Sequence, residues 1–354
     1  MEETMMTYVK EEPQVLHKIL DEFDYSGLAA HLPKQVKRLL ILATGSSYNA
    51  ALAAKYYIEK TAGIIVSIEE PFNFQHYGTI DETTDCILAI SQSGKSTSTI
   101  NVLEKVANSQ IPIVALTNQP DSPLVQQAEC LIDLNIGVEK VDYVTKGFSG
   151  TILNLFLFAC AIGYQNQSIT ESELKDKQQE LNRLIQALPD IIERSETYFS
   201  ENEAKFTSYN RFVCIAYGAN LGIAKEFETK FTETVRLPSA GYELEAYMHG
   251  PYLEAQKNHA LFFLIDEQAI SSRAFRLRNY IEQYVGTTIT VVENDTKEAY
   301  DFSLKLNDLD PFILPLATVV LVQVWSYLTA TANRQDLTID PFPDFDAMLN
   351  SKLL

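Results

Sequence analysis

The sequence predicts an α/β protein made of two similar halves, each a mostly parallel five-stranded sheet flanked by helices in a three-layer α/β/α sandwich. Short apolar runs alternate with helical patterns, which is typical of buried parallel strands joined by helices. Two of these runs end in a turn rich in small and hydroxyl residues that opens a helix. The order then repeats, with Gly218 lying 173 residues after Gly45.

Composition and charge limit the possible partners. The chain has 354 residues, of which 46% are hydrophobic and 21% are charged, so it can bury a sizeable core. A formal charge of -19 disfavours binding to nucleic acid or to an anionic membrane. The apolar runs 156–162 and 312–325 are too short or too interrupted for a spanning helix, and the acidic residues 1–20 do not resemble a signal peptide. We expect a cytoplasmic protein.

Cysteines and histidines give no support for a metal or redox cofactor. Four cysteines lie in apolar stretches without a CxxC pair, and we expect all of them to be buried free thiols: Cys86, Cys130, Cys160 and Cys214. The five histidines show no metal-binding spacing. We therefore predict neither a metal nor another cofactor.

The first half begins with a helical segment over residues 1–23, which Pro13 should divide into two helices. Helical patterns follow at 49–61 and 97–107. The predicted strands of this half are 39–43, 64–68, 86–90, 113–116 and 130–134.

The second half follows a helical region over residues 148–199. Its predicted strands are 212–216, 261–265 and 288–292, with a long helix to Val235, a closing helix over 311–332 and an irregular acidic tail. We divide the chain into an amino-terminal segment (1–30), a first domain (31–165), a linking helix (166–200), a second domain (201–335) and a tail (336–354) that should reach the active site.

The turn that contains Gly45, Ser46 and Ser47 is the first candidate binding site. It connects a strand to a helix, where unpaired backbone N–H groups and the helix dipole favour an anion. The alternative is that Ser46 or Ser47 only caps the helix. A dinucleotide fold also competes, because Glu69 lies where a ribose-binding acid would be expected, but Ser47 and Ala50 replace two of the usual glycines.

A second loop, residues 91–99, has more hydroxyl groups than a helix cap needs. Its side chains and the backbone at Gly94 provide the convergent donors that a phosphate requires. A nucleotide P-loop is not expected, because Ala89 occupies the position of its first glycine. The side chains that fit this need are Ser91, Ser93, Ser96 and Thr97.

The corresponding loop of the second half carries Asp266 and Glu267, which would repel a phosphate. The second half instead offers a helix with Glu226, Lys230 and Glu233 on one face, and His249 before a Gly-Pro pair. The simpler interpretation of that helix is a solvent-exposed face with ion pairs. A histidine at a loop edge can titrate near neutral pH.

Together these motifs resemble the sugar isomerase (SIS) domain family in tandem. The resemblance covers nearly the whole chain and includes the isomerase half of glucosamine-6-phosphate synthase and the fructosamine 6-phosphate deglycases. The matching residues are Gly45-Ser46-Ser47-Tyr48-Asn49-Ala50, Ser91-Gln92-Ser93-Gly94, Lys230-Phe231-Thr232-Glu233 and His249-Gly250-Pro251.

The resemblance implies roles for single residues. The phosphate would be held by Ser47, Ser91, Gln92, Ser93 and Ser96. Glu233 matches the general base that moves a proton between the first two sugar carbons, and His249 matches the histidine of ring opening, commonly supplied by a neighbouring subunit. Lys352 is the late lysine that could contact the open-chain sugar. Thr145 and Lys146 match a pair that lines the cleft, whereas residues 142–144 depart from the synthase pattern. A homodimer with a shared active site is implied.

The resemblance also implies the reaction. The chain starts almost directly at the first SIS copy, so we expect no glutaminase domain and no glutamine-dependent synthesis. We therefore predict a deglycase or deaminase that acts on a 6-phosphorylated amino sugar or sugar-amine adduct. The alternatives are an aldose-ketose phosphosugar isomerase and a non-catalytic phosphosugar sensor. The sensor is disfavoured by the lack of a helix-turn-helix pattern.

Overall fold

The computed structural model describes residues 3–266 and 270–353. The chain forms two compact units, which we call the first-sheet unit and the second-sheet unit. The first-sheet unit comprises residues 14–139, 146–179 and 339–354, and the second-sheet unit comprises residues 1–13, 140–145 and 180–338.

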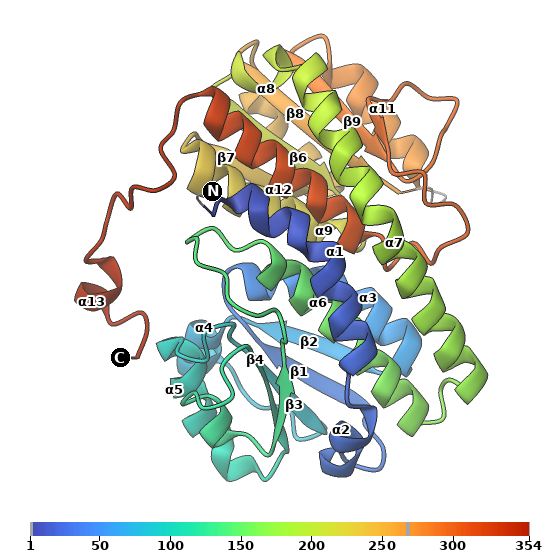
Figure 1. Ribbon diagram of the computed structural model, residues 1–354, viewed down its shortest axis with the longest axis vertical. Coiled ribbons are helices and arrows are strands. Elements are labelled where there is room, and N and C mark those ends of the chain that lie inside the picture. Colours follow the sequence, from blue (N-terminus) through green and yellow to red (C-terminus); the bar gives the residue numbers. More distant parts are fainter. Residues whose placement is uncertain (1–2, 267–269, 354) are drawn as a thin grey trace. The chain divides into compact units, whose positions relative to one another are not determined.

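The first sheet is fully parallel and has the strand order β2-β1-β3-β4-β5 (Figure 1). Its central strands β3 and β4 are buried along their whole length, as expected for a sheet covered on both faces. The strands are β1 (Arg38–Leu42), β2 (Ile65–Glu69), β3 (Cys86–Ile90), β4 (Ile113–Thr117) and β5 (Cys130–Asp133).

Two pairs of helices cover this sheet. Leu40 and Ile87 share an apolar core with Phe74 of α4 and Leu103 of α5, and α3 packs against α6. Figure 1 shows α4 and α5 together, apart from α3 and α6. The helices of the unit are α2 (Tyr25–His31), α3 (Ser46–Ala62), α4 (Pro71–Tyr77), α5 (Thr97–Val106), α6 (Lys146–Gln165), α13 (Phe345–Leu349) and the short η1 (Ala107–Ser109) and η2 (Val125–Gln127).

The second sheet repeats this arrangement. Its order β10-β9-β8-β6-β7, counted from the β7 edge, is the order of the first sheet, and all its pairs are parallel. The predicted duplication and fold class are confirmed. The strands are β6 (Arg211–Ala216), β7 (Ser239–Glu243), β8 (His259–Ile265), β9 (Thr287–Val292) and β10 (Phe302–Ser303).

An aromatic cluster fills one side of this sheet. Trp325 is buried against Phe206 and Phe262, and its indole N–H donates to the Ser195 carbonyl at 3.2 Å. The helices of the unit are α8 (Ala204–Thr207), α9 (Asn220–Lys230), the π-helix η3 (Phe231–Val235), α10 (Leu244–Met248), η4 (Pro251–Glu254), α11 (Ser271–Ile281) and α12 (Pro315–Ala332).

Several predicted elements were wrong. Pro13 does not divide the first helix, because α1 runs from Met5 to Glu22 with Pro13 inside it. By contrast, the predicted helical region 148–199 is helical and consists of two helices, α6 and α7 (Glu171–Glu201). Cys130 is only partly buried because β5 is an edge strand, whereas the other three cysteines are buried as predicted.

Two helices are longer and more continuous than the apolar runs suggested. By length and composition, α6 and α12 could each cross a membrane. However, 94% of the apolar window of α6 and 78% of that of α12 are buried inside the fold. Such burial is typical of the core helices of a soluble protein, and both helices pack in this way here.

Candidate functional site

The two predicted loops of the first half lie at the carboxyl ends of neighbouring strands. Strand β1 pairs with β3 in parallel, so the turn after β1 and the loop after β3 lie next to each other at the carboxyl ends of the strands. The strand order also reverses between β1 and β3. In open α/β sheets, ligands bind in the crevice at such a switch point.

The turn after β1 places Gly45 at the amino terminus of α3. Gly45 has a positive φ of 59° and is the N-cap residue, and no side chain caps the helix. The alternative that Ser46 or Ser47 caps α3 is therefore wrong, because both residues lie inside the first turn. Their partly buried side chains remain beside helix N–H groups that favour an anion.

The loop after β3 is folded tightly on itself around Ser91. The Ser91 carbonyl accepts from the Gly94 N–H at 2.9 Å, and its hydroxyl oxygen accepts from the Ser96 N–H at 3.4 Å. The Ser93 hydroxyl oxygen accepts from the Lys95 N–H at 3.3 Å. Ser96 is the N-cap residue of α5, yet its hydroxyl does not cap the helix. The loop thus presents several hydroxyls around one helix terminus.

Backbone donors are also available in this loop. Within the described ranges, the N–H groups of Gln92 and Ser93 make no hydrogen bond. The Gln92 carbonyl accepts from the Asn118 N–H at 3.0 Å, which holds the loop against the end of β4. Consecutive unpaired N–H groups at the start of a helix form an anion-binding concavity. We call residues 91–96 the serine loop.

The carboxyl-terminal segment lies on the serine loop. The Thr97 N–H donates to the Ser351 carbonyl at 3.1 Å, and the Leu353 N–H donates to the Lys95 carbonyl at 2.9 Å. These bonds make an antiparallel bridge between Ser96 and Lys352. The tail was predicted to be irregular and to reach the active site. It contains the short helix α13, and its end lies beside the predicted phosphate ligands.

Lys352 is held within its own segment. Its Nζ lies 2.6 Å from Asp346 Oδ2, and its side chain is 57% exposed. Lys352 and Ser351 lower the pKa of the Asp346 carboxyl through hydrogen bonds. The lysine is therefore beside Ser96 and is paired with a carboxylate.

The side chain of Gln92 lies close to the start of α6, which begins at Lys146. A Cβ atom at Gly147 would lie 2.5 Å from the Gln92 amide nitrogen, so glycine permits the close approach of this side chain. Lys146, the first residue of α6, is only 4% exposed. Its neighbour Thr145 belongs to the second-sheet unit, where its carbonyl accepts from Gln323 Nε2 at 3.2 Å.

The second-sheet unit contains a group of three charged side chains at the end of α9. Lys230 is 1% exposed, and its Nζ lies 2.7 Å from Glu233 Oε2 and 3.5 Å from Glu226 Oε1. Glu226 is fully buried, whereas the Glu233 side chain is 39% exposed. A buried lysine needs such partners, because an uncompensated buried charge is strongly destabilising. The interpretation of this face as solvent-exposed is wrong.

A π-helix presents Glu233. Residues Phe231–Val235 form this wider turn directly after α9, and Arg236 ends it with φ 59°. The Thr234 hydroxyl donates to the Lys230 carbonyl at 2.7 Å. Short π-helical turns inside or after α-helices occur frequently at functional sites. The local backbone therefore turns one partner of a buried lysine toward solvent.

His249 follows α10 and is exposed. Its Nδ1 lies 2.7 Å from the Glu245 carbonyl. Arg273 lowers the pKa of the Glu245 carboxyl, and the charge of His249 adds a smaller effect. In the part of the chain that the structure describes, His249 forms no hydrogen bond or ion pair with Glu233.

Two further points concern the sequence-based expectations. Asp266 is buried at the end of β8, and its carbonyl accepts from the Tyr217 hydroxyl at 3.0 Å, while Glu267 of the same predicted loop lies outside the described residues. Glu226 was not predicted as a site residue. Its position four residues before Lys230 was the available signal, but spacing does not reveal burial.

Comparisons with known proteins show what this chain is similar to. Residues 34–161 match the SIS domain model. Over 346 residues the chain is 24% identical to the glutamine--fructose-6-phosphate aminotransferase (isomerizing) of Gloeobacter violaceus, covering 95% of this chain and 56% of that protein. The chain thus spans little more than half the length of this curated relative.

Solved structures show the same fold. A protein of Clostridium difficile assigned as a phosphosugar isomerase superposes with a TM-score of 0.89 at 21% identity, over 100% of both chains. The C-terminal domain of glucosamine-fructose-6-phosphate aminotransferase from Francisella tularensis gives a TM-score of 0.85 at 22% identity, over 95% of this chain and 98% of that one.

Proposed function

We propose that this chain is a phosphosugar-processing enzyme of the deglycase or deaminase type, because residues 34–161 match the SIS domain model and the whole chain shares the fold of a solved phosphosugar isomerase-like protein. The substrate would be a 6-phosphorylated amino sugar or sugar-amine adduct. The observation that carries the proposal is the half-exposed Glu233 carboxylate, which a π-helix presents 2.7 Å from a buried lysine.

The serine loop would bind the phosphate group. Ser91, Ser93 and Ser96 supply hydroxyls, Gln92 and Ser93 supply backbone N–H groups, and the turn at Gly45, Ser46 and Ser47 adds donors from the neighbouring strand. Charge-assisted hydrogen bonds to a phosphate are stronger than those to neutral groups. This site would select a phosphorylated sugar over its unphosphorylated analogue.

Glu233 would then move one proton. In a 1-amino-1-deoxy-ketose 6-phosphate the carboxylate takes a proton from C1 while the C2 carbonyl oxygen gains a proton, which gives an enolamine. The carboxylate then returns its proton to C2 while the nitrogen loses one, which gives an imine at C1 and a hydroxyl at C2. Water adds to this imine, and the C1–N bond breaks to release the amine and an aldose 6-phosphate. Lys230 would hold Glu233 in place through its 2.7 Å contact.

The other predicted site residues receive supporting roles. His249 would assist ring opening, Lys352 would contact the open-chain sugar, and Thr145 with Lys146 would line the binding site. We further propose a cytoplasmic homodimer. The Gloeobacter relative is named an isomerizing aminotransferase. This name favours a reaction that handles an amine, and it keeps aldose-ketose isomerisation as the second candidate.

An assay of both products tests the proposal. The purified protein is incubated with fructoselysine 6-phosphate, glucoselysine 6-phosphate, glucosamine 6-phosphate and fructose 6-phosphate, and free amine and sugar phosphate are measured. We expect amine release from at least one of the first three compounds. Ketose-aldose exchange without amine release would instead identify an isomerase, and ligand-induced stabilisation without turnover would identify a sensor.

The variant Glu233→Gln tests the role of the carboxylate. It should lower kcat about a thousandfold, because a general base contributes roughly that factor, while the substrate still raises the melting temperature. Glu282→Gln is the matched control, since Glu282 also pairs with a cation of its own chain segment, Arg278 at 2.9 Å. Loss of substrate-induced stabilisation in Glu233→Gln would assign Glu233 to binding instead.

A further inference from the structure

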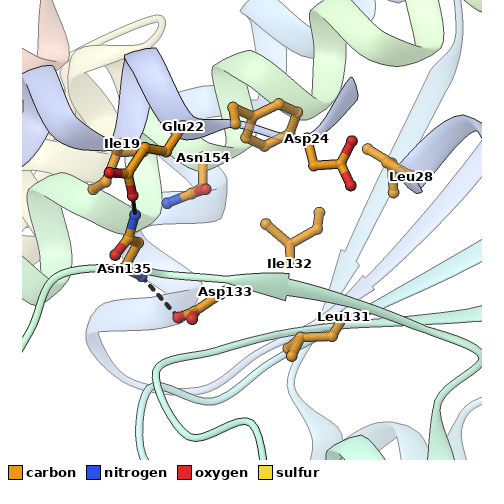
Figure 2. A pocket seen from close by; sticks show the side chains of 10 residues that line it. Ile19, Glu22, Asp24, Leu28, Leu131, Ile132, Asp133, Asn135 and Asn154 are labelled. Carbon is orange, nitrogen blue, oxygen red and sulfur yellow. Dashed lines mark hydrogen bonds between the residues drawn. The ribbon is translucent and has the colours of Figure 1, made fainter. Parts of the chain in front are cut away.

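The first-sheet unit contains a pocket that no residue of the serine loop lines. It has a volume of about 340 Å³ and lies between the end of α1, the start of α2 and the edge strand β5 (Figure 2). None of the residues of the proposed active site lines it. The pocket therefore needs its own explanation.

The rim of this pocket is acidic. Glu22, Asp24 and Asp133 line it, and no lysine or arginine does. Each carboxylate uses one oxygen in a local bond: Asp24 Oδ1 accepts from the Gly27 N–H at 2.8 Å, Asp133 Oδ1 from the Asn135 N–H at 2.9 Å, and Glu22 Oε2 from Asn135 Nδ2 at 2.7 Å. Among the residues that the structure describes, the second oxygen of each carboxylate accepts no hydrogen bond, so it can face a cation.

The buried side-chain amide of Asn154 is a second, independent sign that the pocket lacks a hydrogen-bond donor. Asn154 of α6 lines the pocket and is 1% exposed. Its Nδ2 donates to the Gly150 carbonyl at 2.9 Å, whereas its Oδ1 accepts no hydrogen bond from the described part of the chain. Figure 2 shows this oxygen turned toward the space beside Ile132. An unsatisfied buried acceptor is costly, and a ligand that donates a hydrogen bond would remove the cost.

The remaining walls are apolar. Ile19, Leu28 and Ile132 line the pocket, and all three are buried. Lys18 does not line the pocket, but its Nζ donates to Asn135 Oδ1 at 2.7 Å and lies 4.0 Å from Glu22 Oε2. A small metal ion is less suitable, because the described residues contain no group of three or more His, Cys, Asp or Glu side chains that could hold one.

We propose that this pocket binds a small primary alkylammonium ion. The ammonium group is the donor that the three rim carboxylates and the Asn154 amide oxygen require. The alkyl chain lies against Leu28 and Ile132, where it is removed from water. The site is distinct from the proposed active site, so a variant that abolishes amine binding here leaves turnover unchanged.

Three isosteric probes test this proposal. The melting temperature and the heat of binding are measured with n-pentylammonium chloride, 1-pentanol and sodium pentanoate at equal ionic strength. Only n-pentylammonium should raise the melting temperature, because binding to the native state stabilises it. Equal effects of pentanol would overturn the proposal in favour of a purely apolar pocket. Stabilisation by magnesium chloride and not by the amine would overturn it in favour of a metal site.

Variants locate the binding. The double change Glu22→Gln with Asp133→Asn should weaken n-pentylammonium binding about tenfold, since each exposed charge contributes a severalfold effect. The matched control is Glu82→Gln with Asp121→Asn, which removes two exposed acids of the same unit that do not line the pocket. Unchanged affinity in the first pair would overturn the assignment. Asn154→Leu should also weaken binding, and the acid variants decide the question if that variant does not fold.

Discussion

At the scale of single residues, Gly94 shows how the serine loop depends on one glycine. Its φ is 61°, and a Cβ atom at this position would overlap the hydroxyl oxygen and the Cβ of Ser122. Both the backbone conformation and the space exclude a larger side chain. Gly94→Ala should therefore lower the free energy of unfolding by about 3 kcal/mol, which combines backbone strain with overpacking.

Thermal unfolding followed by circular dichroism measures this loss. Gly137→Ala provides the control, because Gly137 has a φ of 69° but no atom within 4 Å of the place that a Cβ atom would take. It should cost only about 1 kcal/mol, the backbone strain alone. If the two variants lost the same stability, contact with Ser122 would not explain the requirement for glycine.

At the scale of elements, α1 contains a proline at a position where most helices exclude one. Pro13 cannot donate a backbone hydrogen bond, and its ring opposes the carbonyl four residues earlier. Pro13→Ala should stabilise the protein by about 1–3 kcal/mol, because alanine restores the missing donor and has the higher helix propensity. The melting temperature measures the gain.

Gln14→Ala is the control for this prediction. Gln14 is the next residue of α1 and is exposed, so its replacement should change stability by less than about 0.5 kcal/mol. A lower melting temperature for Pro13→Ala than for the wild type would show that packing around α1 requires the proline.

Some of the strands and helices could be predicted from the sequence, and others could not. The buried strands β1, β3 and β4 were predicted within about one residue, because continuous apolar runs between turns have one common explanation. Strand β7 was missed, since its residues Ser239–Glu243 contain a glycine and alternate too weakly. The single helix α1 was missed because packing of its apolar face outweighs the local preference of Pro13.

At the scale of the whole molecule, charge is the dominant feature. The formal charge is -19 and the isoelectric point is near 4.7, so like charges repel across the folded surface at neutral pH. Raising sodium chloride from about 0.02 M to about 0.3 M should raise the melting temperature by a few degrees, because salt screens this repulsion. Potassium chloride should act equally. A lower melting temperature in salt would mean that attractive ion pairs dominate.

The whole molecule also shows where sequence reasoning stops. The serine loop was predicted from its hydroxyl-rich pattern after a strand, and Glu233 was predicted from the resemblance to the SIS family. The burial of Glu226 and Lys230 and the acidic pocket near Asn154 were not found. They arise when segments far apart in the chain pack together, and no short pattern records that packing.

The position of the single tryptophan has a consequence for spectroscopy. Trp325 is buried in the aromatic cluster of the second-sheet unit, and the first-sheet unit contains no tryptophan. Selective excitation of indole fluorescence therefore reports on one unit only. A denaturation curve recorded by fluorescence follows the unit that carries Glu233, while circular dichroism follows both. Any difference between the two curves would give the separate stability of the unit that carries the serine loop.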